Sequence, residues 1–379
     1  MTRSDHNRFW RAKLVNIARY VAVCHVFRMV KKTSAPKEDT PQPELWFMPD
    51  ETESHAPWDL PLPTEPRNLL FTADDWLTAE RTVGRPLAAA AAALARYDER
   101  LCKTPECRER ISLLCANAAL ETQGDWLPAE RIALYIALRE QGADDAQTLS
   151  QADWAVRRLQ SGLDPRLDLN AYLGRHPTDR DGLLELDLFS EPARGEEFSQ
   201  LAGGWLRMID ALTQAQAPVL IRAGAAFHHW RMAEISTPGS VIEAAILASV
   251  IGADGLTAGF VPILLGARTE ILAKGPAEAR LSGWLHAVAN GCARASLELD
   301  RLNNWTSRAR AGIGDLTGRT PPVLVACMAR NTVVSVDLLH AQTGASKAAI
   351  RRNLAEFEHR GLVREVTGQG RYRFWAIKW

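Results

Sequence analysis

NTVVSVDLLHAQTGASKAAIRRNLAEFEHRGLVREVTGQGRYRFW, residues 331–375, is the stretch that decides the fold of the C-terminal part of this 379-residue chain. Ser335 is a good N-cap for a helix, and Ser346 is a good N-cap for the next one. Between these helices, Thr343–Ala345 supplies a tight turn around a glycine, which tolerates the backbone conformation required. A short apolar helix over 323–329 precedes them. This order of elements indicates a helix-turn-helix.

The helix that follows Ser346 has two chemically different faces. Ile350, Leu354 and Phe357 recur at spacings of four and three, so they share one buried stripe. Arginine can donate two parallel hydrogen bonds to guanine, and lysine can neutralise a phosphate. Small and basic side chains therefore suit a helix that enters the major groove of DNA. Such side chains occupy the other face here: Lys347, Ala348, Arg351 and Arg352.

Two short strands are expected after this helix. They cover 362–366 and 371–377, with a glycine-rich turn over 367–370 between them. Arg371 and Arg373 share one face of the second strand because side chains alternate along a strand. They can reach phosphates or the minor groove. Helices, turn and hairpin together predict a winged helix-turn-helix.

The winged helix is predicted over residues 319–379, and this segment is basic. Ten Lys and Arg residues stand against four Asp and Glu residues, a net charge of +6, whereas the whole chain is neutral. A local excess of positive charge favours contact with nucleic acid. A merely solvated basic face, or a winged helix that binds protein, is the alternative. The residues predicted to contact double-stranded DNA are Ser346, Lys347, Ala348, Arg351, Arg352, Gln369, Arg371 and Arg373.

The rest of the chain is predicted to be mainly α-helical. Strand-forming runs are scarce there, and apolar residues make up 46% of the sequence, enough for a sizeable core. We expect a basic N-terminal helix or tail (1–33), a proline-rich linker (34–68), an all-helical domain (69–311) and the winged helix. Within the helical domain we expect helices near Asp74 and from Pro86, over 107–119, after Pro128, and over 198–214, 218–232, 240–251, 270–274 and 277–310, with a loop over 163–182.

The sequence predicts neither a metal nor a cofactor. Its six cysteines are scattered, without a CxxC pair or a Cys/His cluster at zinc spacing, which favours free thiols in a reducing compartment. His228 and His229 are adjacent, and adjacent residues do not share a helix face. They are therefore not expected to ligate one ion.

No uncharged apolar stretch reaches the roughly 18 residues that a transmembrane helix needs. Residues 15–30 are apolar but carry Arg19, His25 and Arg28, and they lack the cleavage site of a signal peptide. An amphipathic helix on a membrane surface or on nucleic acid is the alternative to a frayed helix there. We expect a cytoplasmic protein without a membrane partner.

The C-terminal stretch resembles the winged helix of many proteins of the Fic/Doc superfamily. Residues 67–310 resemble a degenerate relative of the Fic helical fold. The block LARYDERLCKTPECRERISLLCANAALETQGDWLPAERIAL, residues 94–134, is similar to the first conserved block of a bacterial, often plasmid-borne family that pairs the domain DUF1612 with a helix-turn-helix. The resemblance implies a Fic-like helical bundle.

The resemblance also bears on catalysis. Active Fic enzymes transfer AMP through the motif HxFx(D/E)GNGRxxR, in which histidine is the base and the remaining groups hold phosphates. The matching segment here is AEISTPGSVIEAAIL, residues 233–247, with Ala233 at the base position and Ala244 at the distal arginine position. Only Gly239 and Ser240, placed at the start of a helix, could hold a phosphate, and weakly. The resemblance therefore implies a catalytically degenerate domain rather than an enzyme.

Three functions are open at this point. The first is a sequence-specific DNA-binding regulator or plasmid-maintenance factor, whose helical domain forms a homodimer or contacts another protein. The second is a divergent Fic-type AMP transferase. The third is a protein-interaction module that does not bind DNA.

Overall fold

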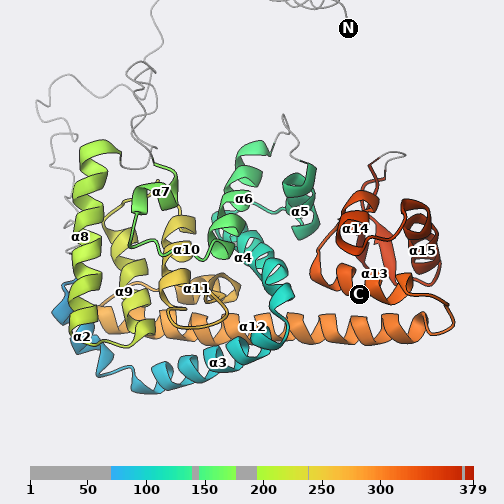
Figure 1. The fold of residues 1–379 in the computed structure, drawn as a ribbon. Coiled ribbons are helices and arrows are strands. Elements are labelled where there is room, and N and C mark those ends of the chain that lie inside the picture. Colours follow the sequence, from blue (N-terminus) through green and yellow to red (C-terminus); the bar gives the residue numbers. More distant parts are fainter. Residues whose placement is uncertain (1–69, 139–144, 176–193, 238, 369–371) are drawn as a thin grey trace, which may run out of the picture. The chain divides into compact units, whose positions relative to one another are not determined.

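The computed structural model describes residues 70–379 apart from 139–144, 176–193, 238 and 369–371. The chain divides into two units between Thr64 and Glu65, and every described residue belongs to the second. Helices dominate these residues, and a small sheet of three strands accompanies them (Figure 1). The prediction of a mainly α-helical protein is confirmed. The predicted tail (1–33) and linker (34–68) lie outside the described residues.

The helical body, residues 73–312, is built from consecutive helices. Its elements are α2 (Ala73–Glu80), α3 (Gly84–Lys103), η2 (Pro105–Cys107), α4 (Arg108–Gln123), α5 (Ala129–Leu138), α6 (Ala146–Gln160), α7 (Leu169–Leu173), α8 (Gly195–Gln214), α9 (Val219–Met232), α10 (Ile242–Ile251), η4 (Ile263–Leu265), α11 (Arg268–Ile271) and α12 (Ala277–Gly312). Thr72 caps α2, since its hydroxyl accepts a hydrogen bond from the Asp75 amide. None of the described helices has the length and apolar character that crossing a bilayer requires.

Two helices depart from the prediction. α6 is not among the expected helices, and α7 interrupts the segment 163–182 that was predicted as a loop. Asp168 caps the start of α7 and Gly174, at a φ of 75°, ends it. Tyr172 is buried and donates a hydrogen bond to the Arg158 carbonyl of α6 at 3.4 Å. The segment does contain turns, as its sequence predicted. Packing against α6 adds a short helix that the turn residues do not predict.

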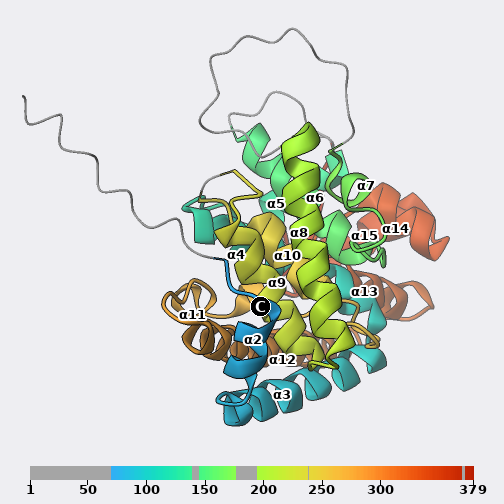
Figure 2. The ribbon, with the colours of Figure 1, turned by 90° about the vertical axis from the view of Figure 1, so that its left-hand side faces the viewer.

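Aromatic side chains fill the core between α8, α9 and α12. α9 packs against α8, α10 and α12, and Figures 1 and 2 show these helices side by side. The Trp205 and Trp230 rings meet edge to face at 5.2 Å, and Trp205 Nε1 donates to the Ala226 carbonyl at 2.8 Å. Phe227 packs on Trp284 of α12 at 5.4 Å. Aromatic pairs of this kind combine a large buried area with a preferred geometry.

The longest described helix, α12, also passes very close to the backbone of another segment. Gly291 faces the end of the loop that leads into η4, and a Cβ added there would lie 2.2 Å from the Pro262 carbonyl oxygen. Only glycine permits this approach. The contact fixes η4 against α12.

A C-terminal module, residues 320–379, follows α12. Its elements are α13 (Thr320–Arg330), β1 (Val334–Ser335), α14 (Val336–Thr343), α15 (Lys347–His359), β2 (Val363–Glu365) and β3 (Phe374–Ile377). The strands form an antiparallel sheet in the order β1-β3-β2. The predicted hairpin had two strands, so β1 is an addition. The strand expected from Arg371 begins only at Phe374, because Tyr372 has a φ of 56°, which an extended strand cannot accommodate.

Polar contacts attach the C-terminal module to the helical body. Trp305 Nε1 of α12 donates to the Leu362 carbonyl at 2.9 Å, and Arg110 of α4 donates to the Asn331 carbonyl at 2.7 Å. A salt bridge of 2.7 Å joins Arg364 of β2 to Glu130 of α5. The module therefore contacts α4, α5 and α12 of the body.

The approach at Gly291 gives a stability prediction. We expect Gly291→Ala to lower the free energy of unfolding by about 2 kcal/mol, because backbone must move to admit the new methyl group. Gly204→Ala on α8 is the matched control, since its Cβ would meet only the end of the Arg207 side chain, at 3.8 Å. It should be neutral or stabilise by up to about 1 kcal/mol. Urea unfolding followed by circular dichroism measures both, and equal stability of the two variants would contradict the close approach.

Candidate functional site

The surface of α15 is set by caps at its start and apolar burial along its length. The Ser346 hydroxyl accepts from the Ala349 amide at 3.3 Å, and Gly344, at a φ of 68°, ends α14 just before it. The Ser335 hydroxyl caps α14 in the same way. The expected apolar stripe is buried: Ile350 and Leu354 are 0% exposed and Phe357 is 1% exposed. Rotation of α15 about its axis is therefore fixed.

The opposite face of α15 is open to solvent. It brings together five of the predicted DNA-contacting residues, all of them exposed: Ser346, Lys347, Ala348, Arg351 and Arg352. Neither Arg351 nor Arg352 forms a hydrogen bond or ion pair with another described residue. Their charges are therefore available to a partner.

The acids of the module are already paired. Asp337 accepts an ion pair from Lys347 at 2.6 Å, which lowers the pKa of that carboxyl. The others pair with arginines of the same module: Glu356 with Arg360 at 2.6 Å, and Glu358 and Glu365 with Arg373 at 3.8 and 3.9 Å. Exposed pairs contribute little to stability. These ion pairs do determine which positive charges remain unpaired, and Arg351 and Arg352 are among them.

The hairpin residues predicted to contact DNA do not form a comparable exposed, unpaired set. Gln369 and Arg371 lie outside the described residues. Arg373 is exposed but precedes β3 rather than standing within it. Its guanidinium faces Glu358 and Glu365 and lies over the Trp375 ring at 5.0 Å. Arg373 is thus a partly neutralised cation, unlike the free one that the alternation pattern suggested.

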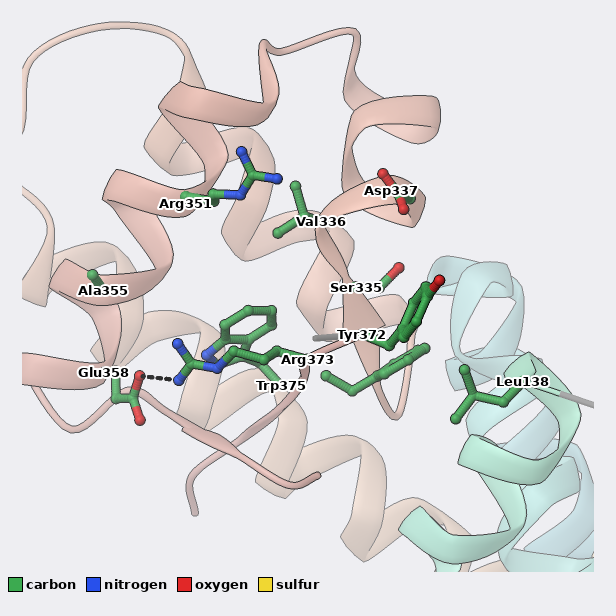
Figure 3. Close-up of a pocket in the computed structure, with 11 residues that line it drawn as sticks. Leu138, Ser335, Val336, Asp337, Arg351, Ala355, Glu358, Tyr372, Arg373 and Trp375 are labelled. Carbon is green, nitrogen blue, oxygen red and sulfur yellow. Dashed lines mark ion pairs between the residues drawn. The ribbon is translucent and has the colours of Figure 1, made fainter. Parts of the chain in front are cut away.

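A groove of about 690 Å³ separates α15 from β3 and the start of α14 (Figure 3). Arg351 comes from α15, Asp337 from α14, and Leu138 from α5 of the body. Sequence reasoning missed two aromatic residues of this groove: Tyr372, which is 77% exposed, and Trp375, which is 5% exposed. Their aromatic character in the RYRFW run was the available signal, but nothing in it showed that they line one groove with Arg351.

The segment matched to the Fic motif, residues 233–247, covers the loop that follows α9 and the first part of α10. Ala233 is the C-cap of α9, and Ala244 is buried in α10. The expectation that Ser240 starts a helix is wrong. Gly239 has a left-handed backbone conformation, and α10 begins only at Ile242. The Ser240 hydroxyl instead accepts a hydrogen bond from Gln123 Nε2 at 2.9 Å. The helix N-terminus invoked for a phosphate is therefore not at Ser240.

A polar network braces this segment. Trp230 Nε1 donates to the Ser236 hydroxyl at 2.7 Å, and that hydroxyl donates to Glu243 at 2.5 Å. Arg175 pairs with the same carboxylate at 2.5 Å and lies over the Phe198 ring. Glu243 also lines an adjoining cavity of about 280 Å³, beside Ser240. A carboxylate on the wall disfavours a phosphate ligand there.

The adjacent histidines of α9 are core residues. His228 is fully buried, contacts the Arg280 carbonyl through Nε2 at 3.2 Å, and stacks on Trp76. Burial, together with the positive charges of Arg280 and Arg231, lowers the pKa of His228 to about 3. Among the described residues, no group of His, Cys, Asp and Glu side chains could hold a metal ion.

No protein-family model and no curated protein sequence matches this chain at a significant level.

The buried histidine gives a pH prediction. His228 stays neutral when folded, whereas an exposed histidine in the unfolded chain takes up a proton below about pH 6.5. Its contribution to stability is therefore complete above pH 6.5 and declines by at most about 1.4 kcal/mol per pH unit as the pH falls. We expect His228→Gln to flatten the dependence of unfolding free energy on pH between 6.5 and 5. The control variant His286→Gln, at an exposed position of α12, should leave this pH dependence unflattened. Identical pH profiles for both variants would contradict the burial of His228.

Proposed function

We propose that the C-terminal module is a winged helix-turn-helix and that the protein is a sequence-specific DNA-binding regulator or plasmid-maintenance factor. The observation that carries the proposal is the exposed face of α15, on which Arg351 and Arg352 have no ion pair within the described part of the chain. In this assignment α15 is the recognition helix and α14 precedes it across the backbone. The segment between β2 and β3 is the wing.

The geometry around α15 supports this assignment. A recognition helix needs a buried side that anchors it and an outer side of small and basic residues that fits a groove about 12 Å wide. The buried stripe from Ile350 to Phe357 supplies the first. Lys347, Ala348 and Arg351 supply the second, near the N-terminal end of the helix, where base contacts of this motif concentrate.

We propose a supporting role for the helical body. In this proposal it is a catalytically degenerate, Fic-like bundle that forms a homodimer or contacts a protein partner, so that two modules bind two half-sites. Alanines at the positions of the Fic base and distal arginine, together with Glu243 within the aligned segment, support the absence of nucleotidyl transfer. Incubation with labelled ATP and candidate acceptor proteins tests this part, and transfer of label would refute it.

Replacing the two unpaired arginines tests DNA binding. A duplex selected from a random pool with the intact protein serves as the ligand, and fluorescence anisotropy measures affinity against salt. We expect Arg351→Ala plus Arg352→Ala to weaken binding at least tenfold and to lower the salt slope by up to about 1.8, the value for two lost phosphate contacts. Arg319→Ala plus Arg330→Ala removes the same charge from two exposed positions at the two ends of α13. An equal loss in that control would reduce the effect to general charge and remove α15 as the recognition helix.

The Asp337–Lys347 pair gives a prediction of opposite sign. Lys347 must leave Asp337 to meet a phosphate, and the carboxylate itself repels the DNA backbone. We expect Asp337→Asn to raise affinity for the selected duplex about threefold or more at low salt, an effect that salt screens. Asp315→Asn is the matched control, because Asp315 pairs with Arg360 at 2.5 Å, away from the exposed cations of α15. Weaker binding by Asp337→Asn would contradict the proposed surface.

A further inference from the structure

The groove between α15 and β3 contains a buried donor that the DNA proposal leaves unused. Trp375 lines the groove, is 5% exposed, and its Nε1 has no hydrogen-bond partner within the described part of the chain. A buried donor without an acceptor costs about 1–3 kcal/mol. Such a group in a cavity wall is a place where a ligand acceptor would stabilise the complex.

The groove has the size and chemistry of a small-molecule site. Its volume of about 690 Å³ falls within the usual range for ligand pockets. Leu138, Val336 and Tyr372 give it apolar and aromatic walls (Figure 3). Arg351 supplies a positive charge that forms no ion pair with another described residue. The two carboxylates of the lining, Asp337 and Glu358, are paired with Lys347 and Arg373. These groups fit a molecule with an apolar body and one anionic acceptor.

The ion pairs beside Trp375 are weak enough for a ligand to enter the groove. Arg373 lies over the Trp375 ring but is held by contacts of only 3.8 and 3.9 Å to Glu358 and Glu365. Its side chain is 44% exposed, so water screens both pairs. A ligand can displace Arg373 at small cost. The indole nitrogen itself is buried, so it is not part of the exposed surface assigned to DNA.

We propose that this groove binds a small organic carboxylate with an apolar or aromatic body. The carboxylate accepts a hydrogen bond from Trp375 Nε1 and pairs with Arg351. Because Arg351 is also assigned to DNA, the bound ligand withdraws it from the duplex and weakens DNA binding. The regulatory step rests on the proposed function, whereas ligand binding does not.

Ligand binding is tested with 3-phenylpropionate on the full chain labelled with ¹⁵N-tryptophan. Trp375→Phe assigns one indole N–H signal among those of the twelve tryptophans. We expect that signal to shift saturably with 3-phenylpropionate and much less with 3-phenylpropanamide, which has the same shape without the charge. Arg351→Met should weaken binding at least tenfold. Arg352→Met, on the same helix but outside the groove, should leave it unchanged. No saturable shift, or equal shifts with acid and amide, would overturn the site.

Competition separates this inference from the DNA proposal. With the selected duplex, saturating 3-phenylpropionate should reduce affinity several-fold in the unmodified chain and have no effect in Arg351→Met. Ligand binding without competition would refute the regulatory step and keep the site. Failure to bind any duplex would refute the proposed function while the indole titration still decides whether the groove is a ligand site.

Discussion

Burial of one apolar stripe determines which face of α15 the C-terminal module exposes to solvent. Ile350, Leu354 and Phe357 can leave water only by facing α13, α14 and the sheet, and this requirement fixes the rotation of α15. Everything on the opposite side, including Lys347 and Arg351, is then forced outward. The exposed basic face is thus a consequence of core packing as much as of charge. Lys347 pairs with Asp337 there, whereas Arg351 and Arg352 form no ion pair with another described residue.

Ion pairs within the module determine which basic side chains of this face remain without a partner. Each of its four acids, Asp337, Glu356, Glu358 and Glu365, lies near a basic residue of the same module. These pairs neutralise part of the local excess and leave Arg351 and Arg352 uncompensated. A net charge of +6 summed over the sequence segment therefore overstates the number of cations free for a partner. Their distribution in space is the more informative quantity.

The helical body is stabilised by aromatic packing, and a local polar network braces the loop between α9 and α10. Trp205, Trp230 and Trp284 fill the space between helices. Ser236 and Arg175 both bond to the Glu243 carboxylate, which lies in the segment aligned with the Fic motif. A carboxylate that is already bonded to a serine and an arginine is poorly placed to act as a base. Contacts from Trp305, Arg110 and Glu130 then tie the C-terminal module to this body.

Local signals were enough to predict much of the structure. Caps at Ser335 and Ser346, and the spacing of Ile350, Leu354 and Phe357, act over a few residues and so are visible in the sequence. Long-range contacts were not: the docking of α7 on α6, the pairing of β1 with β3, and the restriction of β3 to Phe374–Ile377. The groove belongs to this second group, because Arg351, Trp375 and Leu138 come from three elements far apart along the chain. Only tertiary packing brings such residues together, since the sequence records which side chains exist but not which surfaces meet.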